Sequence, residues 1–168
     1  MSDFGWLRGL LGHYRRKGVL IDTNLLVPYL VGAYDPRQLN NCRATRDFPA
    51  ADLELLQSVI QEFERIITTP HILTEVSNLT GKLPDAVLPD FRRTFAGWVK
   101  GVTEVRDASS SILVEDTAFP RMGLTDVAIA RTIPGSFLVL TSEVELYVLL
   151  LQRGVDVVNF NHLRELRD

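Results

Sequence analysis

The stretch Val19-Leu20-Ile21-Asp22-Thr23-Asn24 decides the fold. It begins with three apolar residues in a row and stops at three polar ones, which is typical of a fully buried strand that runs into a turn. Three further segments are also predicted to be strands: residues 66–68, 137–140 and 155–158. Strands that carry apolar residues on both faces indicate a sheet that is covered on both sides, as parallel sheets are.

Helices are predicted between these strands, because apolar residues recur there at three- and four-residue steps. The expected ranges are 25–31, 52–63, 70–79, 85–99, 125–133 and 143–153. Thr69 and Pro70 give the third helix an N-cap and a first-turn proline, and Thr125 is expected to cap the fifth. Alternating strands and helices predict an α/β fold, a three-layer sandwich with a central, mainly parallel sheet flanked by helices.

Three segments have a less regular pattern. Pro28 lies inside the first of these helices and is expected to bend or shorten it, and Pro89 could divide the helix over residues 85–99. Residues 34–49 are polar, are interrupted by proline and are predicted to form a surface loop. Residues 102–122 are expected to hold one short strand and one short helix.

The composition fits one compact domain. The chain has 168 residues, of which 46% are hydrophobic and 23% charged, which is enough to bury a substantial core. We expect a single domain over residues 18–168, preceded by an N-terminal amphipathic extension over residues 1–17 that forms a helix at about 3–16. Two roles are open for this helix: packing on its own domain, or docking to a protein partner or a membrane surface.

Charge and cysteine content exclude several classes of protein. The net charge of −3 gives no global basic field of the kind that nucleic-acid binders have. Cys42 is the only cysteine, so an internal disulfide and a cysteine-rich zinc site are excluded, which suits a reducing cytosol. The histidines at 13, 71 and 162 lack zinc-site spacing, and no Gly-Lys-Ser/Thr phosphate loop occurs.

No targeting or membrane segment is expected either. The longest fully apolar run covers residues 146–151, against the roughly 20 residues that a membrane-spanning helix needs. At the N-terminus the apolar residues come before the basic ones, which is the wrong order for a signal peptide. The expected location is therefore the cytoplasm.

Four acidic residues stand out by their positions. Asp22 directly follows a predicted strand and Glu143 comes three residues after another, so both lie where open parallel sheets bind ligands. Glu75 and Asp126 fall on the apolar stripes of predicted helices, where a lone charge is costly. Several carboxylates in one pocket repel one another, by roughly 4 kcal/mol for a pair 4 Å apart at an effective dielectric near 20. Bound Mg²⁺ or Mn²⁺ would turn this repulsion into a net attraction, since both ions prefer oxygen ligands.

Each of these residues also has an ordinary structural explanation. Asp22 and Asn24 could cap the following helix, and Glu75 could pair with an arginine. Asp126 and Glu143 could be first-turn acids that complement a helix dipole.

Taken in order, the motifs around these acids resemble those of the PIN-domain family over about residues 18–160. The matching segments are Leu20-Ile21-Asp22-Thr23-Asn24-Leu25-Leu26, Ile72-Leu73-Thr74-Glu75-Val76, Gly123-Leu124-Thr125-Asp126-Val127-Ala128-Ile129-Ala130, Leu140-Thr141-Ser142-Glu143 and Gly154-Val155-Asp156-Val157. The fourth motif departs from the family pattern, because Glu143 stands where an aspartate is usual.

The resemblance implies Mg²⁺- or Mn²⁺-dependent hydrolysis of RNA, in which a metal-activated water attacks phosphorus and leaves a 5′ phosphate. Asp22, Glu75 and Asp126 would be metal ligands, with Glu143 as the fourth. Asn24 or Thr141 would orient a ligand or the attacking water.

The resemblance also implies partners. Many small PIN proteins are ribonuclease toxins held inactive by an antitoxin protein, and PIN domains often form homodimers. RNA contacts would come from scattered cations, each of which could equally be an ordinary solvated residue. The candidates are Arg37, Arg43, Arg46, Arg121 and Arg131.

A second function is compatible with the same residues. A non-catalytic PIN-like module would keep the fold and use the acidic pocket, or the N-terminal helix, to bind protein or RNA. The glutamate at position 143 favours this alternative.

Overall fold

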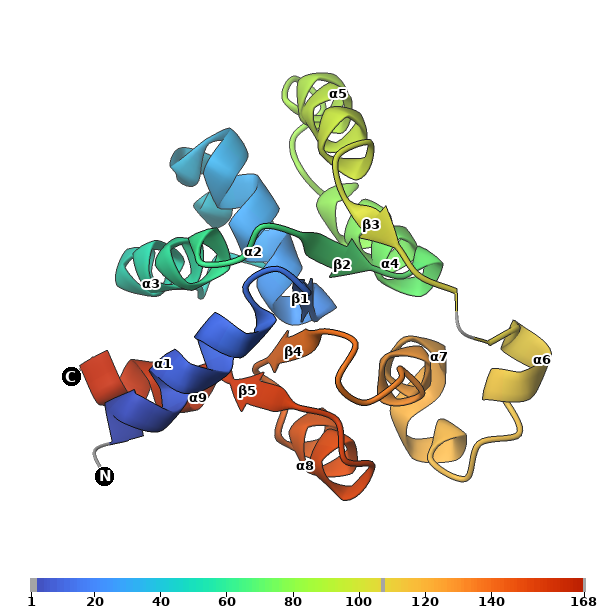
Figure 1. The fold of residues 1–168 in the computed structure, drawn as a ribbon. Helices are drawn as coiled ribbons and strands as arrows, with labels where there is room; N and C mark the ends of the chain where they lie inside the picture. The colour runs from blue at the N-terminus through green and yellow to red at the C-terminus, as the bar shows by residue number, and fades with distance from the viewer. Residues whose placement is uncertain (1–2, 107, 168) are drawn as a thin grey trace.

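The fold was analysed in a computed structural model, which describes residues 3–106 and 108–167. Its centre is a five-stranded sheet, made of β1 (Val19–Ile21), β2 (Ile66–Thr68), β3 (Thr103–Glu104), β4 (Leu138–Thr141) and β5 (Val157–Asn159). The strand order is β3-β2-β1-β4-β5 and every neighbouring pair is parallel. The predicted α/β fold with a parallel sheet is therefore confirmed (Figure 1).

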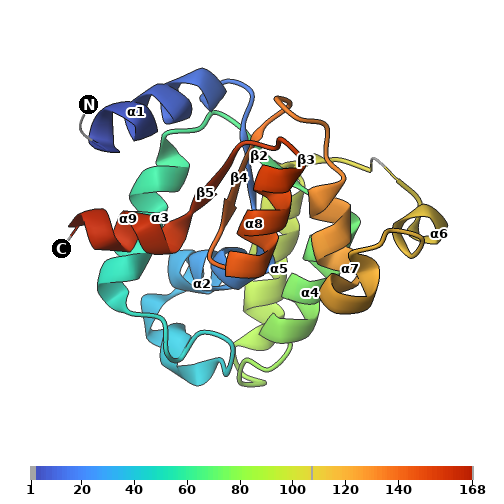
Figure 2. The ribbon, with the colours of Figure 1, turned by 90° about the horizontal axis from the view of Figure 1, so that it is seen from below.

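Helices cover both faces of this sheet. In Figure 1, α2 and α3 lie on one side of it and α7 and α8 on the other, and Figure 2 shows the same layers from below. The helices are α1 (Asp3–Tyr14), α2 (Thr23–Tyr34), the 3-10 helix η1 (Pro36–Asn41), α3 (Ala50–Gln61), α4 (Pro70–Thr80), α5 (Leu88–Val99), α6 (Ser110–Leu113), α7 (Phe119–Ala130), α8 (Val144–Gln152) and α9 (Phe160–Arg167).

The central strands form the middle of the core. All three residues of β1 are fully buried, and Val19, Leu20 and Ile21 pair in register with Leu138, Val139 and Leu140 of β4. Gly18 enters β1 with φ +106°, and a Cβ there would lie 2.8 Å from the carbonyl oxygen of Arg65. This position therefore requires glycine, which brings the starts of β1 and β2 together.

The N-terminal helix α1 packs on the domain. Leu7, Leu10 and Leu11 lie against the core, while Tyr14 is buried within it. The hydroxyl of Tyr14 donates a hydrogen bond to Asp156, just before β5. Burial and this bond raise the pKa of Tyr14 to about 12. Of the two roles open for this helix, the structure shows packing on its own domain.

Several predicted element boundaries are corrected. Residues 34–49 are not simply a surface loop, because they contain η1 and bury Leu39 and Thr45. The helix α2 runs on across Pro28 to Tyr34, and Pro89 lies at the start of α5 instead of dividing it. The C-terminal helix α9 was not predicted.

The helix that carries Asp126 also starts differently from the prediction. It follows a kink in α7 at Gly123, where φ is 81° and ψ is 179°, a conformation open almost only to glycine. Thr125 therefore lies within the helix and not at its cap, and its hydroxyl bonds Glu75.

None of the helices described in residues 3–106 and 108–167 combines the length and apolar character that crossing a membrane requires.

Candidate active site

Asp22 lies at the carboxyl end of β1 with its side chain 2% exposed. Its backbone N–H donates to Leu140 in β4, and its carbonyl oxygen accepts the first hydrogen bonds of α2. The carboxylate does not cap that helix. Instead, Oδ2 accepts a 2.8 Å hydrogen bond from Oγ1 of Thr141, at the end of β4. The side chain is thus held between the ends of two strands and not used for capping.

Glu75 is held by two threonines from other helices. Its Oε2 accepts a 2.9 Å hydrogen bond from Thr23 in α2, and its Oε1 accepts a 2.7 Å bond from Thr125 in α7. Hydroxyl groups, and not the arginine considered from the sequence, are therefore its partners. Two bonds from different elements fix the carboxylate in one orientation.

Glu143 stands at the N-cap position of α8 without capping the helix through its side chain. Its Oε1 accepts a hydrogen bond from the amide of Asn24, and its backbone N–H donates to the hydroxyl of Thr141 at 3.0 Å. Asn24 and Thr141 therefore each form a hydrogen bond with at least one of the acids. Thr141 contacts both Asp22 and Glu143.

Asp126 faces a surface cleft of about 500 Å³, whose wall also includes Glu143, Glu145 and Arg121. The kink at Gly123 places Asp126 in the first turn of the helical segment that follows. A helix N-terminus favours a carboxylate, yet burial, followed by repulsion from Asp22, Glu143 and Glu75, raises the pKa of Asp126 to about 7.

The four acids form one electrostatic cluster. Burial first, and then the charges on Glu143 and Glu75, raise the pKa of Asp22 to about 6, against the lowering effect of the Thr141 hydrogen bond. The structure thus brings together all four acids and both supporting residues that the sequence singled out. We call Asp22, Glu75, Asp126 and Glu143 the acid cluster.

The donor atoms of the acid cluster suit a hard divalent cation. All are carboxylate oxygens, which Mg²⁺ and Mn²⁺ prefer, and each carboxylate has about four lone-pair positions, of which the hydrogen bonds above use at most two. Within the described residues, however, no three His, Cys, Asp or Glu side chains are grouped closely enough to hold one ion. Binding of one ion by three of these carboxylates would therefore require the side chains to move closer together.

The arginines proposed for RNA contact separate into groups. Arg121 lines the cleft and lies 3.6 Å from Glu145. Arg131 instead pairs with the buried carboxylate of Asp116 at 3.3 Å. Arg37, Arg43 and Arg46 follow the far end of α2, a helix of 12 residues and so roughly 18 Å long, which begins at the acid cluster. Of the five, Arg121 is the one that lines the cleft together with Asp126 and Glu143.

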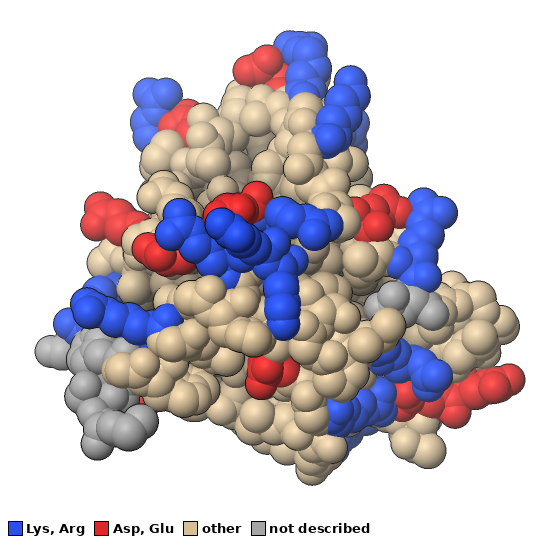
Figure 3. Space-filling model, viewed as in Figure 1, with Lys and Arg blue, Asp and Glu red and all other residues tan. Residues whose placement is uncertain are grey.

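A different group of cations lies where the strands begin, at the end of the sheet opposite to the acid cluster. Figure 3 shows Lys and Arg side chains gathered near the middle of the face that Figure 1 presents, over the segments that enter β1 and β2. Arg15, Arg16, Lys17 and Arg65, which precede those strands, are exposed. The segments that enter β1 and β2 therefore carry several cations, of which Arg15 pairs with Glu64, whereas the four acids gather at the carboxyl ends of the strands.

Thr23 and Thr125 are the site residues that sequence analysis missed. Both directly neighbour a predicted acid in the sequence, Asp22 and Asp126, yet both bond to Glu75. Only adjacency to the acid motifs could have indicated them.

Comparison of the chain with protein-family models, with curated proteins and with solved structures found no match.

Proposed function

We propose that this protein is a PIN-like, metal-dependent endoribonuclease that hydrolyses RNA phosphodiester bonds at the acid cluster. The observation that carries the proposal is the convergence of four carboxylates from four separate elements, with the pKa values of Asp22 and Asp126 raised to about 6 and about 7. Such a site is unfavourable without a cation, and perturbed acids in a cleft are typical of functional sites.

Asp22, Glu75, Asp126 and Glu143 would hold Mg²⁺ or Mn²⁺, which supplies Lewis-acid activation of water and of the scissile phosphate. The protein's own groups fix the ligands: Thr141 orients Asp22, and Asn24 orients Glu143. Because the pKa of Asp126 lies near neutral pH, this carboxyl releases its proton as a cation binds. Arg121, at the rim of the cleft, would contact a neighbouring phosphate.

The direct test is cleavage of a structured, fluorescently labelled RNA with Mg²⁺, with Mn²⁺ and with EDTA. The proposal expects cleavage that needs a divalent cation and leaves 5′ phosphates. Asp22→Asn and Asp126→Asn should lose it while remaining folded by circular dichroism, and Asp47→Asn, on the exposed segment before α3, is the matched control. Robust cleavage by both active-site variants would overturn the assignment.

A non-catalytic PIN-like module is the alternative. It would predict that the wild-type protein binds labelled RNA or a protein partner without cleaving RNA under any of these metal conditions.

The proposal extends to a toxin that is held inactive by an antitoxin, and to a homodimer, both from the family resemblance. Expression of the wild-type chain would then arrest bacterial growth, whereas the Asp126→Asn variant would not. Sedimentation equilibrium of the purified protein tests the dimer.

A further inference from the structure

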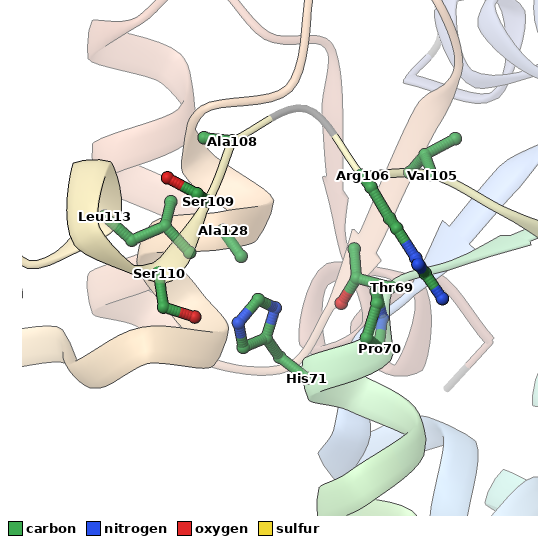
Figure 4. A pocket seen from close by; sticks show the side chains of 10 residues that line it. All are labelled: Thr69, Pro70, His71, Val105, Arg106, Ala108, Ser109, Ser110, Leu113 and Ala128. Atoms are coloured by element: carbon green, nitrogen blue, oxygen red, sulfur yellow. The ribbon is translucent and has the colours of Figure 1, made fainter.

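A second cavity, of about 490 Å³, lies beside the acid cluster. Thr69 and His71 line it from the start of α4, Arg106 from the end of β3, Ser110 and Leu113 from α6, and Ala128 from α7. Its volume lies within the range of small-molecule sites. We call this cavity the His71 pocket (Figure 4).

The His71 pocket is one helical turn away from the acid cluster. His71 and Glu75 are four residues apart on α4 and so lie on the same face of this helix, about 6 Å apart along its axis. On the facing helix, Ala128 lines the pocket while Thr125, three residues earlier, bonds Glu75. A ligand in the pocket would therefore lie next to whatever the acids hold.

The pocket differs from the acid cluster in chemistry. Its described lining contains no acidic residue and combines apolar walls with hydroxyls, an imidazole and a guanidinium. Figure 4 shows the His71 ring projecting from α4 toward Ser110 and Ala128, with Leu113 beyond it and Arg106 on the opposite side. A polar aromatic group that carries a negative charge fits this combination.

One ring nitrogen of His71 has no hydrogen-bond partner among the described residues. This atom, Nδ1, is buried, whereas buried polar atoms are as a rule satisfied. Arg106 is exposed and uses Nε and Nη2 to reach Glu104. Since a guanidinium has five N–H groups, it can bond a phosphate as well.

We propose that the His71 pocket binds the nucleobase of the RNA nucleotide next to the scissile phosphodiester. This inference rests on the proposed nuclease function and specifies which part of the RNA substrate the protein recognises. The base lies against Leu113 and Ala128, its edge bonds His71 Nδ1 and the Ser110 hydroxyl, and Arg106 contacts the attached phosphate. Single-stranded RNA is generally recognised by such edge contacts to splayed bases.

Binding is tested without catalysis. The protein is titrated in EDTA with AMP, GMP, CMP and UMP in turn, and the imidazole resonances of His71 are followed by NMR. At least one monophosphate should shift them. His71→Phe and Ala128→Leu, which fills the cavity, should each weaken that binding at least tenfold by calorimetry. His162→Phe, a matched change on α9, should leave it unchanged.

Stability separates a binding role from a structural one. Because Nδ1 of His71 has no hydrogen-bond partner among the residues that the structure describes, the His71→Phe variant should unfold at the same temperature as the wild type or at a higher one. A clear drop in its melting temperature, or equal binding by all variants, or no binding of any monophosphate, overturns the proposal.

Cleavage mapping distinguishes this proposal from the proposed function. In a randomised RNA pool, the wild type should prefer particular bases beside the cut, and His71→Phe should relax this preference while still cleaving. If His71→Phe cleaves with the base preference of the wild type, the proposed nucleobase site is wrong and the nuclease assignment is unaffected. If no RNA is cleaved but the monophosphates bind as described, the nuclease assignment fails and the pocket stands as a nucleotide site.

Discussion

The hydroxyl of Thr125, on α7, donates a 2.7 Å hydrogen bond to Oε1 of Glu75, on α4. The other oxygen of this carboxylate accepts from Thr23, on α2. One acid therefore links three helices, and its orientation depends on hydroxyl groups that have no charge of their own. Holding a ligand rigidly through neighbouring hydrogen bonds is what a metal site requires of its surroundings.

The Thr125→Val substitution should weaken the site while keeping its shape. Valine preserves the volume but removes the donor, so Glu75 loses one of its two hydroxyl partners. We expect metal-dependent RNA cleavage to fall about 10- to 100-fold, as is typical for such supporting residues. The free energy of unfolding should fall by about 1 kcal/mol, measured by urea denaturation.

Thr132→Val is the matched control. Thr132 is also buried, but its hydroxyl has no hydrogen-bond partner among the residues described. This variant should keep full cleavage and be at least as stable as the wild type. Equal losses in both threonine variants would show that Thr125 acts through packing alone.

The Asp126→Asn substitution should abolish cleavage and make the metal-free protein more stable. Burial and then the neighbouring charges of Asp22 and Glu143 raise the pKa of Asp126 to about 7, so its ionised form is unfavourable at pH 8. Removing the charge should make the metal-free protein roughly 1–3 kcal/mol more stable at this pH, while cleavage is lost. Chemical denaturation in EDTA measures this gain, and a less stable variant would contradict the electrostatic account.

The acid cluster also predicts how metal and pH act together. Asp22 and Asp126 have pKa values of about 6 and about 7 in the folded protein, against an ordinary value near 3.9. Their contribution to stability is therefore fully present below about pH 4 and is lost as the pH rises through 6 and 7. A divalent cation competes with these protons, so Mg²⁺ should raise the melting temperature at pH 8 and have little effect at pH 5. A larger rise in melting temperature with Mg²⁺ at pH 5 than at pH 8 would exclude the acid cluster as the metal site.

Much of the fold could be predicted from local pattern. The strand Val19–Ile21 ends where the apolar run meets Asp22, and the observed β2 has the predicted bounds. The positions of Asp22 and Glu143 followed from the general rule that parallel strands present ligand sites at their carboxyl ends, whereas Glu75 and Asp126 stood out as charges on apolar helix stripes. Their assignment as one site depended in addition on the ordered resemblance of the motifs.

Contacts between distant residues could not be predicted in this way. Thr125 was expected to cap its own helix, but the backbone at Gly123 already provides the break, which leaves its hydroxyl free for Glu75, 50 residues earlier. The pairing of Arg131 could not be predicted for a related reason, since nothing near it in the sequence indicates that the buried Asp116 will pair with it.

Asp116 should govern stability at low pH. Its buried carboxylate accepts hydrogen bonds from Arg153 at 2.7 and 3.0 Å and from the backbone before α7. These partners, Arg153 first, hold the pKa of Asp116 well below its usual range. The stabilisation is therefore present above about pH 4 and is lost as the pH falls further. Asp116→Asn should cost about 2–4 kcal/mol at pH 7, because it leaves Arg153 without its charge partner.

This cost should be much smaller at pH 2, where the unfolded chain already binds a proton at this carboxyl and most of the stabilisation is lost. Urea denaturation at pH 7 and pH 2 measures both values, with the exposed Asp47→Asn as a control. A cost that is independent of pH would mean that shape, and not charge, matters at this position.

Glu143 is the acid whose identity departs from the family pattern, and its role can be separated from that of Asp126. Because the Glu143 charge raises the pKa of both Asp22 and Asp126, Glu143→Gln should lower both values, which carbon-detected NMR titration can follow. The amide keeps an oxygen that Asn24 can bond, so the local structure should persist.

We expect cleavage by Glu143→Gln to survive but to need about 10-fold more Mg²⁺ for half-maximal rate. Glu145→Gln, whose charge is the smallest of the effects on Asp126, should change neither quantity appreciably. If Glu143→Gln left the Mg²⁺ requirement at the wild-type level while lowering the two pKa values, Glu143 would be a neighbour of the metal site and not one of its ligands.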